Sequence, residues 1–306
     1  MLETVLAILQ NTLRSATPII LAAMGGQFTE HAGIMNIGMD GIMLMGSFFA
    51  VLASYYLASA ALGVLAAILI GLLMGILFGV LVIRFRSDEF IIGVALNIFA
   101  GGVTVFLLRT IFGVAGAFAD PAIKALPYVS LDFLNDVPFI GPLLNNNSIL
   151  VYVSWLLVLI CWIAVYKTPF GLRLRASGEH PESLRSAGVN PNKLKYISSM
   201  LCGMLCGLAG AHLALGYLTQ FSEGMSSSRG FIAFACIIFG RANPPKVFLA
   251  SLLFGFMDAL ALRLQFVGIS SNLSGMMPYI MTVLMMVYVV VTDNARKSRT
   301  LKLNAG

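Results

Sequence analysis

The sequence predicts an all-α fold, a polytopic membrane helix bundle with about 8–9 transmembrane or half-spanning helices, some of them discontinuous. Three observations support this prediction. The mean hydropathy is +0.92, and only 10% of the 306 residues are charged, whereas soluble proteins have about 25%. Apolar runs near the length of a membrane-spanning helix, about 20 residues, recur along the chain. These runs do not alternate with polar residues as the strands of a transmembrane β-barrel would.

We expect one integral membrane domain over residues 1–306, without a cleaved signal peptide, because the N-terminal stretch lacks a basic n-region. Segment 229–240 is too short to span a bilayer alone. Polar stretches at 25–41 and 219–230 interrupt the apolar pattern, and 111–148 is predicted to be an external loop. The expected hydrophobic segments are 4–24, 37–59, 61–83, 90–110, 149–166, 196–218, 229–240, 247–266 and 274–292.

The positions of the basic residues predict the orientation, because cytoplasmic loops of membrane proteins are enriched in lysine and arginine. Fourteen of the nineteen basic residues fall in four segments. These are the loop 167–195, the tail 293–306, the pair Arg84 and Arg86, and the pair Arg241 and Lys246. All four should face the cytoplasm, which places 111–148, the break at 219–230 and the N-terminus outside. The net charge of +6 therefore reflects topology, and we expect no nucleic-acid partner.

The basic loop contains its own helix signals. Pro181 suits the first helical position, Glu182 complements the positive end of the helix dipole, and Gly188 ends the turn. The predicted cytoplasmic helix has about two turns and is too short to be stable without a partner surface. The alternative is a solvated basic loop that only sets the orientation of the chain.

The sequence of this loop, FGLRLRASGEHPESLRSAGV, resembles the corresponding loop of permease subunits in bacterial ATP-binding-cassette (ABC) importers of the branched-chain amino acid, ribose and nucleoside group. The resemblance continues in GGQFTEHAGIMNIGMDGIMLMGSF, SSRGFIAFACIIFGRANP and LLFGFMDALALRLQ, and it covers nearly the whole chain. It is most similar to the nucleoside-type permease that works with a basic membrane lipoprotein. Ser183 and Leu184 depart from the pattern, because two alanines usually stand there.

The resemblance implies that residues 181–187 form a coupling helix, held in a cleft of a cytoplasmic ATPase. No GxxxxGK[ST] motif occurs in this chain, so ATP would be bound by the partner, and no cofactor or metal is expected here. The implied partners are the ATPase, a second related permease in a probable heterodimer, and an external substrate-binding lipoprotein, all at the bacterial cytoplasmic membrane. The residues implied to shape or anchor the coupling loop are Gly171, Arg173, Arg175, Gly178, Glu179, Pro181, Glu182 and Gly188.

Irregular backbone inside a membrane is tolerated where it lines a cavity, so the two polar breaks are candidate parts of a solute pathway. They share an echo, Gln27-Phe28-Thr29-Glu30 and Gln220-Phe221-Ser222-Glu223, which indicates either an inverted repeat or chance. Asp40 either caps the half-helix at Gly41 or meets solute. The candidate pathway residues are Gln27, Phe28, Asn36, Asp40, Asn97, Phe221 and Ser227.

Other polar residues in the apolar segments have structural explanations. His212 is expected to be a hydrogen-bonded packing residue, Asp258 and Arg263 to pair with each other or with neighbours, and the four cysteines to be small core residues. No carboxylate pair with catalytic spacing and no HExxH or GxSxG motif favours an intramembrane enzyme. A nucleoside or a simple sugar is the expected solute, and an ion-driven secondary transporter is the alternative function.

Overall fold

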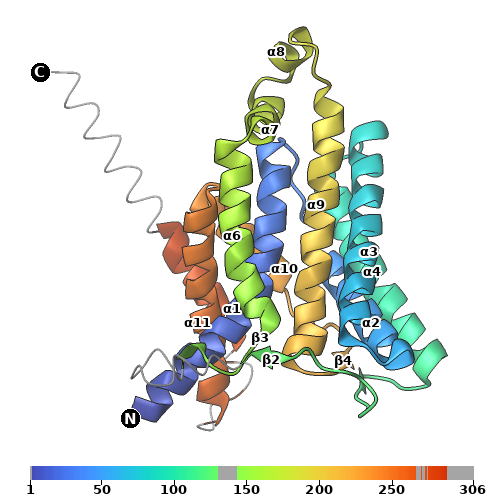
Figure 1. The fold of residues 1–306 in the computed structure, drawn as a ribbon, viewed down its shortest axis with the longest axis vertical. Helices are drawn as coiled ribbons and strands as arrows, with labels where there is room; N and C mark the ends of the chain where they lie inside the picture. The colour runs from blue at the N-terminus through green and yellow to red at the C-terminus, as the bar shows by residue number, and fades with distance from the viewer. Residues whose placement is uncertain (1, 130–142, 267–269, 271–272, 274, 288–306) are drawn as a thin grey trace, which may run out of the picture.

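The computed structural model describes residues 2–129, 143–266, 270, 273 and 275–287. In these residues it is a helix bundle with two small antiparallel ribbons at one end (Figure 1). The strands are β1 (Ala117–Phe118) paired with β4 (Phe221–Ser222), and β2 (Tyr128–Val129) paired with β3 (Asn147–Ser148). The helices are α1 (Leu2–His31), α2 (Met39–Leu57), α3 (Ala60–Gly79), α4 (Glu89–Phe112), α6 (Ile149–Lys167), α7 (Pro169–Glu179), α8 (Pro181–Ser186), α9 (Pro191–Ala211), α10 (Arg229–Gly240) and α11 (Pro244–Phe266).

Six of the described helices are long and apolar enough to cross a membrane: α2, α4, α6, α11, and α3 and α9 with their π-helical extensions Val80–Arg84 and His212–Tyr217. The 30-residue α1 is long enough but less apolar, and α10 and Met277–Val287 are shorter apolar helices. The predicted helical membrane fold is confirmed. Leu65, Leu69 and Leu73 on α3 are exposed, as expected for side chains that face lipid.

The described basic segments gather at one end of the bundle, the upper end in Figure 1, where α7 and α8 lie. Arg86, Arg185 and Lys195 line one cavity there, and Arg175 and Arg241 line another. The N-terminus and both ribbons lie at the opposite end (Figure 1). The described basic segments thus share one end of the bundle, as expected from the sequence. That this end faces the cytoplasm stays a prediction, and the name cytoplasmic end below means the end that carries α8. The tail 293–306 lies outside the described residues.

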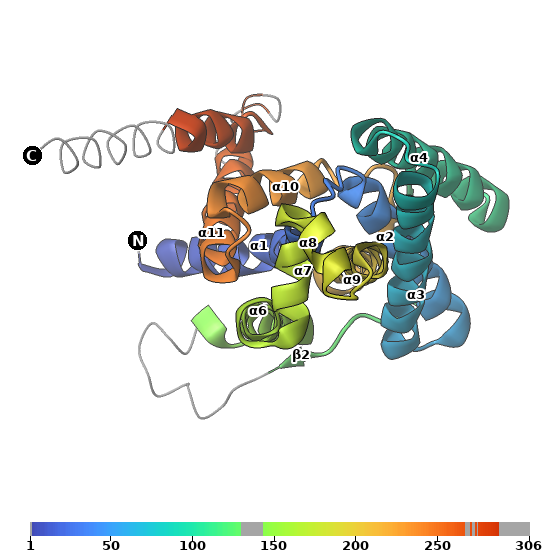
Figure 2. The ribbon, with the colours of Figure 1, turned by 90° about the horizontal axis from the view of Figure 1, so that it is seen from above.

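Corresponding helices in the two halves of the protein run in opposite directions. In Figure 1, α1 runs toward the cytoplasmic end and α9 runs away from it. α3 packs along α9, α11 packs along α1, and α1 and α9 contact each other. Viewed from the cytoplasmic end, α9 lies between α3 and α1 (Figure 2). The two echoed tetrapeptides fall at matching places, at the end of α1 and just after the extension of α9. This is the topology that an inverted repeat produces.

One expectation about the polar breaks needs correction. The sequence predicted an irregular stretch from 25 to 41, but α1 continues to His31, and only the seven residues before Met39 leave the helix. The glycines there allow close packing: a Cβ on Gly25 would lie 3.0 Å from the Cys202 carbonyl oxygen. Within 167–195, the helix expected from Pro181 is present as α8, and the structure adds α7 before it and an earlier start of α9, at Pro191.

Candidate functional site

The first part of the candidate site is a junction where the N-termini of α2 and α10 meet. Asp40, at the start of α2, accepts a hydrogen bond from the backbone N–H of Gly230 at 2.9 Å and another from the Ser226 hydroxyl at 2.9 Å. Gly230 lies in the first turn of α10, and Ser226 lies in the segment just before this helix. Because the positive ends of two helix dipoles face this carboxylate, its negative charge is stabilised there. Asp40 is therefore a cap, but of α10 rather than of its own helix.

Two asparagines hold the backbone at the start of α2. Asn97 on α4 accepts from the Gly41 N–H at 2.7 Å and donates to the Ile37 carbonyl at 3.1 Å. Buried Asn36 accepts from the Gly38 N–H at 3.0 Å and donates to Cys202 Sγ at 3.4 Å. Both side chains position the junction, and this use was not apparent from the sequence. Whether they also contact solute stays a prediction.

Asn97→Ala is expected to lower transport, because the Gly41 N–H then loses its acceptor inside the membrane, a loss of about 1–3 kcal/mol. Radiolabelled solute uptake, normalised to the permease level in the membrane, measures the effect. The control is Thr104→Ala on the same helix, since the Thr104 hydroxyl bonds only to carbonyls of α4. Normal uptake by Asn97→Ala would remove this residue from the site.

Three other predicted pathway residues are packed in the conformation described. Gln27 and Phe221 are fully buried and Phe28 is nearly so. Phe221 meets Phe48 edge to face, with ring centroids 5.2 Å apart, and Gln27 donates to Met24 Sδ at 3.3 Å. The three side chains thus pack into the interior of the described residues, and none of them takes part in the hydrogen bonds given above for Asp40 and Asn97. Ser227 is exposed and lines a separate cavity of about 410 Å³.

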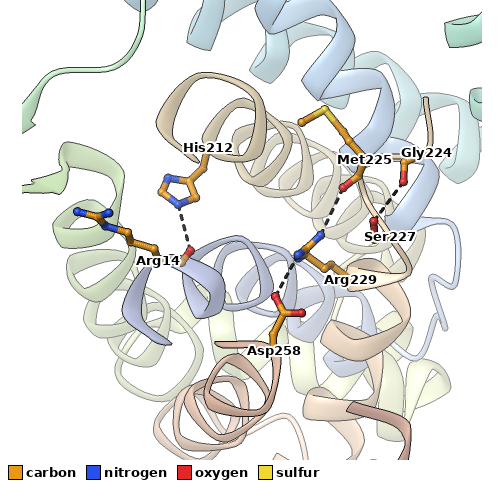
Figure 3. A network of polar contacts seen from close by, with 7 residues as sticks. All are labelled: Arg14, His212, Gly224, Met225, Ser227, Arg229 and Asp258. Carbon is orange, nitrogen blue, oxygen red and sulfur yellow. Dashed lines mark hydrogen bonds and ion pairs between the residues drawn. The ribbon is translucent and has the colours of Figure 1, made fainter. Parts of the chain in front are cut away.

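That cavity contains an ion pair that the sequence did not assign. Arg229, the first residue of α10, donates to Asp258 of α11 at 3.0 Å (Figure 3). Of the expected options for Asp258, pairing with a neighbour is the one observed. His212 is fully buried and contacts the Arg14 carbonyl at 3.3 Å (Figure 3), as expected for a packing residue. All four cysteines are buried too.

The second part of the candidate site is the cytoplasmic loop. α8 begins at Pro181 as predicted, and Gly188 follows it with φ at +77°. Leu184 is the buried side chain of α8, whereas Glu182, Ser183 and Ser186 are exposed. In Figure 1, α8 stands out from the bundle. The face that a partner can reach is therefore polar, and the leucine that departs from the family pattern packs inward.

The predicted loop residues divide into exposed and anchoring groups. Arg173, Glu179 and Glu182 are exposed, and Glu182 pairs with Arg185 at 3.5 Å. Arg175 lies over the Tyr166 ring, 5.0 Å from its centroid, and Gly171 packs against the Val165 carbonyl. The loop is thus held at its base and open at its tip.

Gly178 connects the loop to the junction. A Cβ on Gly178 would lie 2.6 Å from the His31 carbonyl oxygen and 2.9 Å from the Gly33 nitrogen. Gly33 has φ at +70°, and the chain then runs directly to Asn36 and Asp40. α7 therefore packs directly against the backbone of the segment that leads into α2.

Titratable groups surround this contact at the cytoplasmic end of α1, beyond its apolar part. A cavity of about 530 Å³ is lined by Glu30, His31, Arg175, Glu179 and Arg241 among others. Burial raises the pKa of Glu30, and the charge of Glu89 raises it further. Burial lowers the pKa of His31, against the hydrogen bond to the Ala242 carbonyl, which raises it. The base of the loop thus lies in a partly desolvated, charged environment.

Comparisons with known proteins place the chain among transport permeases. The family model described as "branched-chain amino acid transport system / permease component" matches residues 8–286. The chain is 33% identical to a guanosine ABC transporter permease protein of Bacillus subtilis, over 89% of this chain and 88% of the relative. It is 32% identical to a nucleoside ABC transporter permease protein of Lactococcus lactis, over 93% and 92%. A putative glucose ABC transporter permease protein of Haloferax volcanii is 29% identical over 84% and 78%. No solved structure matches.

Proposed function

The chain belongs to the family of branched-chain amino acid transport system permease components, and we propose that it moves nucleosides across the cytoplasmic membrane as the permease subunit of an ATP-driven importer. It is a multi-pass protein of that membrane. Two relatives named for guanosine and for nucleosides, at 33% and 32% identity, support nucleosides as the solute class. The relative named for glucose, at 29% identity, supports the alternative of a simple sugar. ATP hydrolysis belongs to the partner ATPase in this proposal.

The observation that carries the proposal is the protruding α8 with its fixed base. A short polar helix at the cytoplasmic end, tied through Gly178 and Gly33 to the backbone of the helix junction, is suited to transmit movement from a partner to the membrane interior. Coupling of this kind needs a packed element with two discrete arrangements rather than a flexible loop. We assign Arg173, Pro181, Glu182 and Gly188 to the docking element and Gly171, Arg175 and Gly178 to its base.

Membership in this family implies an ATPase and a substrate-binding partner. We further propose that the second permease of the pair is a different, related chain, and that the binding partner is an external lipoprotein. Thermal stabilisation of the purified binding partner by a panel of nucleosides and sugars would separate the two solute classes.

Cysteine placed at Ser186 is expected to crosslink to the ATPase in membranes that contain the assembled complex. The native cysteines are buried and should react little, and Tyr128→Cys, exposed at the opposite end, is the matched control that should not crosslink. Denaturing electrophoresis with detection of both chains provides the readout. The proposal fails if Ser186→Cys captures no ATPase, or if an impermeant reagent labels it from outside intact cells.

An ion-driven secondary transporter is not favoured, because the relatives named above are ABC transporter permeases. The two mechanisms differ in energy source. ATP-driven uptake stops when the phosphate-binding lysine of the ATPase is replaced, and it continues with an uncoupler at constant ATP.

A further inference from the structure

The cavity beside α10 has the dimensions of a site for a small solute. Its volume is about 410 Å³, within the range of about 300–1,000 Å³ typical of ligand pockets. Its lining combines Ser227 and Ser228, the Arg229–Asp258 pair, Gln265 and Tyr279. Ile19, midway along α1, also lines it, so the cavity lies at the level where a discontinuous helix begins. Transporters commonly bind their solutes at such places.

The charges at this cavity are balanced. Arg229 and Asp258 pair at 3.0 Å, with side chains 15% and 22% exposed. The N-terminus of α10, which would otherwise favour an anion, is already capped by Asp40. A positive charge at the first position of a helix interacts unfavourably with the positive end of the helix dipole. Helix stability therefore does not explain why Arg229 stands there. A charge-balanced pocket suits a neutral polar solute and offers no uncompensated cation to a phosphate.

Hydrogen-bonding capacity remains at the pair. Nε of Arg229 is buried and lacks a partner among the described residues. Oδ2 of Asp258 accepts from Arg229, and Nη1 of Arg229 donates to the Met225 carbonyl at 3.4 Å (Figure 3). Polar groups that stay unused inside a membrane protein are costly, and in native structures they are usually satisfied by a ligand or water.

The backbone beside the pair is also strained. Ser227 and Ser228 have φ values of +47° and +62°, a region that side chains other than glycine rarely adopt and that costs about 1–3 kcal/mol per residue. Such strain is concentrated at functional sites. Ser227 is exposed and lines the cavity, and its hydroxyl makes a long contact of 3.4 Å with the Gly224 carbonyl (Figure 3).

We propose that this cavity is the solute subsite of the permease, and that the Arg229–Asp258 pair selects uncharged, hydroxyl-rich solutes such as nucleosides over their phosphorylated forms. This proposal rests on the proposed function. The Asp258 carboxylate accepts hydrogen bonds from the vicinal hydroxyls of a ribose, Arg229 and Gln265 offer donors to a base, and the exposed Tyr279 ring offers it a stacking face. A phosphorylated solute would place a second anion beside Asp258.

Protection of a cysteine tests the subsite directly. Ser227→Cys, in the assembled complex, is expected to react with a small thiol reagent, since Ser227 is exposed while the native cysteines are buried. Guanosine should slow this labelling and guanosine 5′-monophosphate should not. Equal labelling with and without guanosine would overturn the subsite. Equal protection by the monophosphate would overturn the selection by charge.

Two sets of variants separate recognition from folding. Asp258→Asn leaves the charge of Arg229 without a counter-charge, which can destabilise the protein. The decisive variant is therefore the double substitution Arg229→Met with Asp258→Leu. Replacing both members of a buried ion pair by apolar residues is often neutral for stability. We expect this double variant to assemble and to hydrolyse ATP in response to the binding partner, but to lose uptake by about tenfold or more, as for removal of hydrogen bonds to charged groups.

The outcome also distinguishes this proposal from the proposed function. Wild-type uptake by the double variant would show that the pair is only structural, and would overturn the subsite while leaving the importer intact. Failure of the proposed function would instead appear in the unaltered complex, as absence of ATP-driven nucleoside uptake.

Discussion

Gly203→Val is expected to remove the folded protein from the membrane rather than to reduce its rate of transport. Gly203 lies where α9 crosses α3, and a Cβ there would collide with the Gly71 carbonyl and lie 2.9 Å from Gly75 Cα. The obstacles are backbone atoms, so no side chain can rotate away, and the helices must separate. Overpacking of this kind costs about 3 kcal/mol, and α3 and α9 make one of the largest contacts in the bundle.

The contact has a recognisable pattern. Gly71 and Gly75 on α3 face Gly203 and Gly207 on α9, so a GxxxG motif from each helix forms the crossing. In a bilayer, small residues allow close backbone approach, and packing largely replaces the hydrophobic effect as the source of helix association. The expected measurements are a lost or strongly reduced permease band in the membrane fraction and a lower thermal midpoint in detergent.

Gly102→Val on α4 is the matched control, because a Cβ at Gly102 meets nothing within 4 Å. Its level and thermal midpoint should stay near those of the unaltered protein. A Gly203→Val protein with the same midpoint as this control would contradict the described crossing of α3 and α9.

Other glycines show where sequence reasoning succeeded and where it failed. Apolar length predicted the spans, because it follows from the transfer of local groups between water and lipid. The basic residues gather at one end of the bundle, and the assignment of that end to the cytoplasm stays a prediction. Pro181 and Gly188 predicted α8 for a similar reason, since their effects are local to the backbone. Gly25 and Gly26, in contrast, were predicted to begin an irregular stretch that interrupts the helix. In the fold they let α1 pack closely, Gly25 against Cys202 and Gly26 against Met39, and only the tertiary contact separates these two uses.

The candidate site was less predictable, because its contacts join distant parts of the chain. Asp40 and Asn97 were identified as polar residues in apolar segments, but their partners, Gly230 and Gly41, are set by the packing of α2, α4 and α10. The pairing of Arg229 with Asp258 had one local sign, an arginine at the unfavourable end of a short apolar helix. Gln27, Phe28 and Phe221 had the right composition for a pathway, yet they are buried in this conformation.

Asp40→Ala is expected to abolish transport, because the carboxylate joins the starts of α2 and α10 at the junction. The substitution leaves the Gly230 N–H and the Ser226 hydroxyl without their acceptor, and each hydrogen bond to a charged group contributes about 1.5–3 kcal/mol. It also leaves the two facing helix dipoles without their counter-charge. Uptake driven by ATP in proteoliposomes, with the assembled complex quantified in parallel, measures the effect.

A graded pair of variants makes the test specific to the cap. Asp40→Asn keeps one oxygen that can accept from the Gly230 N–H but loses the charge, so it should retain part of the uptake that Asp40→Ala loses. Asp120→Ala is the control, since Asp120 lies in the loop predicted to be external and accepts from the Ala122 N–H of its own turn, and uptake by this variant should remain near normal. If Asp40→Ala transports as well as Asp120→Ala, the junction does not depend on the carboxylate, and the coupling path from Gly178 through Gly33 to α2 must end elsewhere.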